Sequence, residues 1–203
     1  MTWNERVLIR PRFWTREACA RVRRAMDCGT TAPAEVYDEG YVVSRVARRS
    51  LEVDVDRRTL TWIHRALIPA RVLASAFFGV ALDVSEGAGL LRYPPGGFYR
   101  PHRDVLPEAA GEWQRQIAVV IFLNSAGPDA GPDASPDASN EAGEGEPFGG
   151  GELRLHPDGS EHDADTLDIV PRCGTLVAFP AARLHEVLPV TLGTRDAVVD
   201  WFA

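Results

Sequence analysis

The sequence predicts a mainly β domain of the α+β class, in which a jelly roll is supported by helices that come earlier in the chain. From residue 90 onward, short apolar runs alternate with Gly, Pro and Asp turn signals, whereas helical periodicity is confined to the first part of the chain. Many short strands without intervening helices are typical of a closed sandwich or barrel. We therefore expect helical support over residues 1–87 and a jelly-roll core, or double-stranded β-helix, over residues 88–203.

The helical support contains two helical patterns. Thr15 can cap a helix that runs to about Cys28, where Gly29 follows as a stop signal. A longer pattern covers residues 57–78, and Pro69 predicts a break or bend within it. Alternating residues between the helices predict two strands: Tyr41–Val46 and Leu51–Val55.

The jelly-roll core should contain eight strands, because eight apolar runs of strand length follow residue 88. They are Leu90–Tyr93, Phe98–His102, Ile117–Leu123, Glu152–His156, Leu167–Val170, Thr175–Phe179, His185–Val190 and Arg195–Phe202. Five apolar residues of these strands are expected to surround any site within the core, subject to strand phase: Ile117, Val119, Ile121, Leu176 and Val177.

An acidic insert interrupts this pattern at about residues 125–147. The segment repeats Gly-Pro-Asp-Ala, lacks aromatic and β-branched residues, and therefore cannot bury enough apolar surface to order itself. It carries six of the acidic residues and no basic one, so the rest of the chain is almost neutral although the whole has a formal charge of −7. At 203 residues, the chain is expected to be one domain with a disordered insert.

Composition excludes several classes of function. All 22 basic residues are arginine, and they form no basic footprint of the kind that nucleic acids require. No apolar stretch reaches the length of a membrane span, and no signal pattern is present, so we expect a cytoplasmic protein without nucleic-acid or membrane partners. Three cysteines without CxxC spacing argue against a disulfide framework and a structural zinc site.

Two histidines and one carboxylate form the most informative set of residues. His102 and Asp104 are two residues apart, so both side chains can reach one ion if the strand that contains His102 continues to Asp104. The third member, His185, begins a distant predicted strand. Two imidazoles and one carboxylate are typical of a non-haem Fe(II) site that leaves positions open for a bidentate anion and O₂.

Arg195 follows His185 by ten residues, at the start of the last predicted strand. A cosubstrate that binds iron through a 2-oxo acid group still has a second carboxylate, and guanidinium binds carboxylate through two parallel hydrogen bonds. We therefore expect Arg195 to be buried in the same pocket as the iron.

Other histidines offer weaker alternatives. His156 and Asp158 share the His-x-Asp spacing, but Pro-Asp-Gly at residues 157–159 predicts a turn that would point the two side chains in different directions. His64 lies in a helical pattern without a ligand partner at i+4, which favours a surface or structural role.

The ordered motifs from residue 88 to the end resemble the 2-oxoglutarate and Fe(II)-dependent dioxygenases, and within them the prolyl 4-hydroxylase-like group. The quoted segments are Leu91-Arg92-Tyr93, Gly97 and Tyr99, Pro101-His102-Arg103-Asp104, Phe122-Leu123-Asn124, Gly149-Gly150-Gly151-Glu152-Leu153, Val170-Pro171-Arg172-Cys173-Gly174, Phe179, His185, Pro189-Val190-Thr191, Gly193-Thr194-Arg195 and Trp201.

This resemblance implies a role for each site residue. His102, Asp104 and His185 would bind Fe(II), and Arg195 would bind the distal carboxylate of 2-oxoglutarate. Tyr93 and Tyr99 would be pocket tyrosines next to the cosubstrate. Relatives commonly have a tyrosine where this chain has Phe122, so Thr175 or a water would assist Arg195 instead.

The implied reaction consumes 2-oxoglutarate and O₂, releases succinate and CO₂, and hydroxylates an unactivated carbon, with ascorbate as reductant. The substrate would be a peptidyl residue such as proline, or a free amino acid or small metabolite. The alternative is a cupin-like jelly roll that binds metal and ligand without turnover. Four residues near the expected mouth could select an acidic substrate, although rim or salt-bridge roles are favoured for them: Trp113, Arg115, Arg154 and Arg183.

Overall fold

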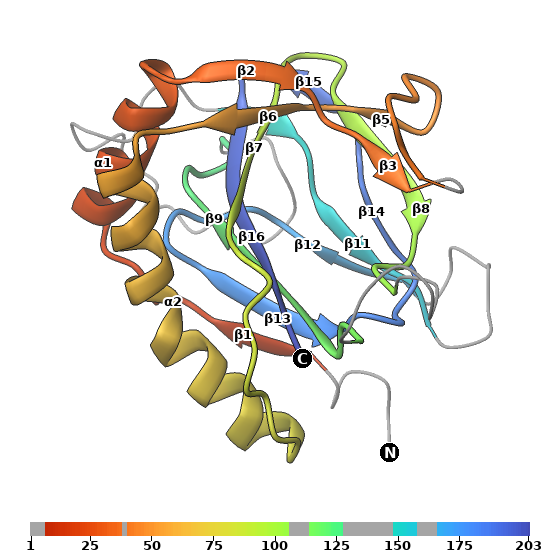
Figure 1. Ribbon diagram of the computed structural model, residues 1–203. Helices are drawn as coiled ribbons and strands as arrows, with labels where there is room; N and C mark the ends of the chain where they lie inside the picture. The colour runs from red at the N-terminus through yellow and green to blue at the C-terminus, as the bar shows by residue number, and fades with distance from the viewer. Residues whose placement is uncertain (1–6, 38–39, 106–113, 128–147, 158–165) are drawn as a thin grey trace.

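The computed structural model describes residues 7–37, 40–105, 114–127, 148–157 and 166–203. Two antiparallel sheets face each other, and both helices lie on the outer side of the larger sheet (Figure 1). This arrangement confirms the predicted jelly roll with helical support. Within the described residues, no helix combines the length and the apolar character needed to span a membrane.

Helix α1 spans Arg16–Asp27, and helix α2 spans Arg57–Phe78. Thr15 caps α1 as predicted, since its side chain accepts a hydrogen bond from the Ala18 N–H. The predicted break in α2 is wrong, because the helix continues through Pro69. Gly29 is needed for space and not for a left-handed turn: a Cβ there would lie 2.3 Å from the Asp54 carbonyl oxygen.

The larger sheet has the strand order β1-β13-β9-β16-β7-β6-β2. Its strands are β1 (Leu8–Arg10), β13 (Leu176–Pro180), β9 (Ile117–Phe122), β16 (Arg195–Phe202), β7 (Gly89–Tyr93), β6 (Leu51–Asp54) and β2 (Thr30–Pro33). The N-terminal strands β1 and β2 were not predicted. The outermost residues of a sheet need little apolar alternation, and every β2 residue is exposed.

The smaller sheet has the order β12-β11-β14-β8-β5. Its strands are β12 (Leu167–Ile169), β11 (Leu153–Leu155), β14 (His185–Val187), β8 (Phe98–His102) and β5 (Arg48–Arg49). Two short ribbons complete the fold: β3 (Val36–Tyr37) with β4 (Tyr41–Val42), and β10 (Gly149–Gly150) with β15 (Val190–Leu192). The single strand predicted over residues 185–190 is therefore two strands that pair with different partners.

Each face of the larger sheet packs in its own core. Strand phase directs Ile117, Val119, Ile121 and Leu176 toward the helices, where they join helix residues such as Val22 and Ile63. Four residues of the expected apolar shell thus belong to the core with the helices. The layer between the sheets contains Val177 with Ala118, Val120, Phe122, Leu153, Leu155 and Phe179.

The acidic insert leaves and re-enters the fold at adjacent points. Ala126 and Phe148 form a β-bridge, both are buried, and the Gly127 N–H donates to the Phe148 carbonyl at 2.8 Å. Residues 128–147, which contain all the acidic residues of the predicted insert, lie outside the described residues.

Candidate active site

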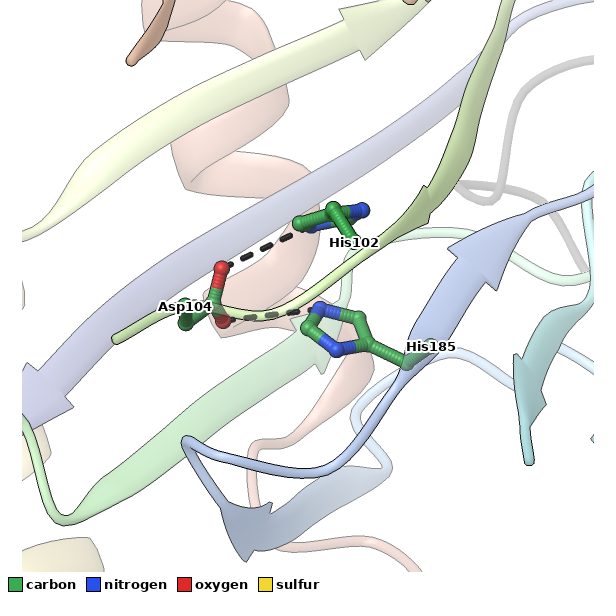
Figure 2. Close-up of side chains that lie close together, drawn as sticks. All are labelled: His102, Asp104 and His185. Carbon is green, nitrogen blue, oxygen red and sulfur yellow. Dashed lines mark ion pairs between the residues drawn. The ribbon is translucent and has the colours of Figure 1, made fainter. Parts of the chain in front are cut away.

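Two neighbouring strands bring His102 and His185 together. His102 ends β8, His185 begins β14, and the two residues are partners in the antiparallel register. Asp104 lies two residues beyond the end of β8 and points between them: its carboxylate oxygens are 3.5 Å from His102 Nε2 and 3.4 Å from His185 Nε2 (Figure 2). One strand pair thus brings together two histidines that are far apart in the sequence, and the three side chains offer ligand atoms within 4.8 Å of one another.

Backbone carbonyls orient both imidazoles. His102 Nδ1 lies 2.8 Å from the Arg100 carbonyl oxygen, and His185 Nδ1 lies 2.9 Å from the Arg183 carbonyl oxygen. A protonated Nδ1 that donates to a carbonyl leaves Nε2 as the free lone pair. Both Nε2 atoms face Asp104. The tautomer with the proton on Nδ1 leaves this Nε2 lone pair available to a metal ion.

The loop Ala181–Leu184 fixes Asp104 and His185 at the same time. The Asp104 N–H donates to the Ala181 carbonyl at 2.9 Å, and the Arg103 guanidinium donates to the Ala182 carbonyl. The loop itself is anchored through Arg183, which is 2% exposed and donates to the His156 carbonyl at 3.0 Å. Asp104 is therefore held in place although its strand has ended.

The electrostatics of the three side chains suit metal binding. Burial lowers the pKa of His185 to about 4, so its imidazole is neutral at physiological pH. Burial by itself raises the pKa of Asp104, but interactions with His185 and His102 outweigh it and hold that pKa well below its usual range. A neutral imidazole and an ionised carboxylate are the forms that coordinate a divalent cation.

A cavity of about 420 Å³ opens next to these residues, and Arg195 lines it. Arg195 is 2% exposed, its guanidinium lies 4.9 Å from the Tyr93 ring and 5.2 Å from the Phe122 ring, and its buried Nε has no hydrogen-bond partner. Burial lowers the pKa of Arg195 and outweighs the opposing effects of Tyr93, Asp196 and Glu152. A buried cation without a charged partner is unfavourable, so this position is suited to an anionic ligand.

Neighbouring residues hold Arg195 at this position. Gly151 has a φ of +71°, and a Cβ there would lie 2.9 Å from Arg195 Cδ, so only glycine leaves room for the side chain. Asn124 binds the start of β16, since it donates to the Thr194 carbonyl at 2.7 Å and accepts from the Asp196 N–H at 3.0 Å. The motifs around residues 122–124 and 149–151 thus converge on Arg195.

The remaining predicted site residues differ in their positions. Tyr93 is buried opposite Arg195 in the β7–β16 register, and Tyr99 stacks on His102 with ring centroids 3.4 Å apart. Burial raises the pKa of Tyr99 to about 12, so its hydroxyl stays protonated. Thr175 is buried beside Phe122, whose N–H donates to the Thr175 carbonyl at 3.1 Å, but it does not line the cavity.

The alternative histidines have structural contacts. His156 is buried and its Nε2 lies 3.1 Å from Glu186, whereas Asp158 lies outside the described residues. His64 is exposed and accepts a hydrogen bond from the Ala88 N–H at 3.3 Å. Neither histidine belongs to a cluster of metal-binding groups in the described part of the chain.

The three expected mouth residues that the structure describes do not form one surface. Arg115 lines the cavity but pairs with Glu86, Arg154 pairs with Asp168 at 2.7 Å, and Arg183 is buried within the loop that precedes His185. Trp113 lies outside the described residues. The salt-bridge role is confirmed for Arg154.

The N-terminal half also contributes to the cavity, in part through residues 35–41, which the sequence predicts to be a loop that sets substrate specificity. Seven of its described residues line the cavity: Glu35, Val36, Tyr37, Tyr41, Ser44, Ala47 and Arg48. Ser44, Ala47 and Arg48 were not predicted at the cavity, because short irregular segments and two-residue strands have no periodicity to detect.

Comparisons with known proteins agree with this geometry. Residues 88–203 match the model of the 2OG-Fe(II) oxygenase superfamily, and no curated protein matches the sequence. Among solved structures, a prolyl-4-hydroxylase of Pseudomonas putida is similar at 21% identity and a TM-score of 0.64, covering 97% of this chain and 91% of its own.

Two further structures have the same fold. The viral collagen prolyl hydroxylase of Paramecium bursaria Chlorella virus-1 is 16% identical, with a TM-score of 0.59 and coverage of 97% and 95% of the two chains. A Trichoplax adhaerens prolyl hydroxylase in complex with a hypoxia inducible factor peptide fragment is 17% identical, with a TM-score of 0.68 and coverage of 98% and 83%. Because the family model spans more than half of the residues, the chain belongs to the 2OG-Fe(II) oxygenase superfamily and is an enzyme that uses Fe(II), 2-oxoglutarate and O₂.

Proposed function

We propose that this oxygenase hydroxylates an unactivated carbon of a peptidyl residue, with proline as the first candidate. The observation that carries the proposal is the meeting of three metal-binding side chains and one unpaired buried arginine at a single cavity. The names of the similar structures support the choice of residue, since three are prolyl hydroxylases and one was solved with a peptide fragment. A free amino acid or small metabolite is the alternative substrate.

The proposed iron ligands are His102, Asp104 and His185. Their donor set fits Fe(II), because two neutral imidazoles and one carboxylate leave the remaining positions of the ion open. Iron bound together with 2-oxoglutarate would supply the oxidising chemistry by which O₂, 2-oxoglutarate and the substrate C–H group become succinate, CO₂ and the hydroxylated substrate. The protein orients the ligands through the Arg100 and Arg183 carbonyls and keeps His185 neutral by burial.

Arg195 is the proposed anchor for the distal carboxylate of 2-oxoglutarate. Its unpartnered Nε and its low exposure fit an anion that the described residues do not supply. Tyr93 and Tyr99 line the same cavity and bring hydroxyl groups to it. Phe122 provides a ring against the guanidinium but no hydroxyl, so Arg195 contributes most of the polar binding. The assistance of Thr175 or a water stays a prediction.

Incubation with Fe(II), 2-oxoglutarate, ascorbate and proline-containing peptides tests the function. We expect succinate release and a peptide that gains the mass of one oxygen atom. Metal binding without succinate, with or without peptide, would instead favour a binding module. A cytoplasmic location and the use of ascorbate remain predictions.

An Arg195→Met variant tests the cosubstrate role. Charge-assisted hydrogen bonds are worth roughly 1.5–3 kcal/mol each, so we expect the KM for 2-oxoglutarate to rise on the order of 10- to 100-fold. Arg154→Met is the matched control, because Arg154 lies outside the cavity and pairs with Asp168. An unchanged KM in the Arg195 variant would contradict the assignment.

A further inference from the structure

The mouth of the cavity carries an excess of positive charge. Among the described residues, its lining includes five arginines and two acidic residues, in a chain whose formal charge is −7. The arginines are Arg48, Arg100, Arg103, Arg115 and Arg195, and the acidic residues are Glu35 and Asp104. Charge of one sign gathered at a cleft, against the sign of the whole protein, attracts ligands of opposite charge.

Two of these arginines already have a function or a charged partner. Arg195 lies within the cavity next to Tyr93, where it is the proposed anchor of the cosubstrate. Arg115 is neutralised by Glu86, stacks at 3.9 Å on the Trp201 ring, and donates to the Asp104 carbonyl at 3.2 Å. Neither is available to select a substrate.

The other three arginines are held only by neutral acceptors. Arg48 donates to the Ser50 hydroxyl at 2.7 Å and to the Glu35 carbonyl at 2.9 Å. Arg103 donates to the Ala182 carbonyl, and Arg100 donates to the Val46 carbonyl at 3.5 Å. Within the described residues no carboxylate lies within 4.0 Å of these three guanidinium groups, so no acidic side chain of that part of the protein compensates their charges.

A stack of rings connects this charge to the metal site. The Arg48 guanidinium lies 4.6 Å from the Tyr99 ring centroid, and Tyr99 stacks at 3.4 Å on the His102 ring. Neighbouring residues of an extended peptide are about 3.3–3.6 Å apart along the chain, and their side chains add to that reach. A carboxylate beside the reacting carbon can therefore lie against Arg48 while that carbon lies next to His102.

We propose that the substrate is anionic, with a carboxylate close to the carbon that is hydroxylated, and that Arg48, Arg100 and Arg103 bind this carboxylate. The proposal rests on the proposed hydroxylase function and names its substrate class. Guanidinium pairs with carboxylate through two parallel hydrogen bonds, so the contact selects by geometry as well as by charge.

Matched peptides test the proposal. Each contains one proline, flanked by Asp and Glu, by Asn and Gln, or by Lys, and free acidic amino acids form a separate arm. We expect kcat/KM for the acidic peptide to exceed that for the neutral peptide at least tenfold, and the preference to shrink as the ionic strength rises from about 0.05 to about 0.5 M. Preference for the free acidic amino acids would assign the same carboxylate chemistry to a small substrate.

Three variants locate the effect. Arg100→Gln and the double variant Arg48→Gln/Arg100→Gln should progressively remove the preference for the acidic peptide. Arg65→Gln is the control, because it deletes the same charge from an exposed position on helix α2, away from the cavity. Equal turnover of acidic and neutral peptides, or an unchanged preference in both cavity variants, would overturn the proposal.

Two further measurements separate this proposal from the hydroxylase function. Succinate formed without peptide reports the oxygenase reaction alone. Binding of fluorescent peptides to protein loaded with Mn(II) and 2-oxoglutarate reports charge selection without turnover. An acidic peptide that binds but is not hydroxylated would contradict the proposed reaction and support the site for an anionic substrate. Succinate release without any charge preference would support the oxygenase reaction and overturn the anionic-substrate site.

Discussion

Two buried histidine–carboxylate pairs lie beside each other on the smaller sheet, and they differ in function. His185 is 3.4 Å from Asp104, and His156 is 3.1 Å from Glu186. Because side chains alternate along a strand, His185 faces the cavity between the sheets while the adjacent Glu186 faces the opposite side with Arg154. Only the first pair meets a second histidine. A histidine–carboxylate contact is therefore not a metal site until strand phase supplies the third ligand and an open cavity.

The largest expected difference between the pairs is in metal binding. His185→Gln removes a ligand atom, so we expect Fe(II) affinity to fall on the order of 100-fold or more. His156→Gln, the matched control, should change affinity less than about threefold because it alters no ligand. Anaerobic calorimetric titration with Fe(II) measures both, and similar losses in the two variants would show that the comparison is wrong.

The next effect is on the cosubstrate side of the cavity. Gly151→Ala places a Cβ 2.9 Å from Arg195 Cδ, so the guanidinium must shift, and we expect the KM for 2-oxoglutarate to rise about tenfold. Gly96→Ala is the control, since Gly96 also has a positive φ of +76° but no atom near the added Cβ. Steady-state kinetics on both variants would refute the steric explanation if their KM values rose equally.

Lowering the pH should destabilise the metal-free protein, because His185 is buried in its neutral form. Its pKa is about 4 in the folded protein and about 6.5 when unfolded, so between these pH values the unfolded chain binds one more proton. Stability of the metal-free protein should therefore decrease as the pH is lowered through this range, by up to about 3 kcal/mol. The lowered pKa of Asp104 acts only below about pH 4, outside this window.

Urea unfolding at several pH values measures this slope. In His185→Gln the slope between about pH 6.5 and 4 should become shallower, because the titrating group is gone. An identical slope in the variant would assign the acid sensitivity to other groups.

The smallest effect on stability and activity is expected for the acidic insert, which belongs to neither histidine–carboxylate pair. Replacing residues 128–147 with a short Gly-Ser linker should change the free energy of unfolding by no more than about 1 kcal/mol. The ends of this segment already meet at the Ala126–Phe148 bridge. Succinate release should also persist, and loss of activity in a folded variant would give the acidic insert a role in the site.

The sequence was sufficient for elements with strong local patterns. The ranges expected for α2, β8 and β16 have the same bounds in the structure. For α2 and β16, the long helical pattern and the largely apolar run leave little choice. Ile117 and Ile121 show the limit of sequence-based prediction, because they were expected around the site and instead face the helices. In a strand buried on both faces, every residue is apolar and alternation carries no phase information.

The candidate site was likewise predicted only in part, because local spacing indicates its residues but tertiary contacts hold them in place. The spacing of His102 and Asp104 predicted that they could share one ion if the strand continued to Asp104, but the strand ends at His102. What holds Asp104 is a hydrogen bond to Ala181, far away in the sequence. Likewise, the clearance that Gly151 gives Arg195 depends on tertiary packing that no local pattern encodes.

The loop that carries Ala181 and Arg183 joins a strand of the larger sheet to one of the smaller sheet. Because one of its carbonyls binds the Asp104 amide and another binds the His185 ring, both proposed ligands depend on one short segment. An opening of this segment would release the two ligands in a single event. Loss of metal should then be all-or-none, and amide hydrogen exchange at Asp104 and Ala181 should slow together when metal binds.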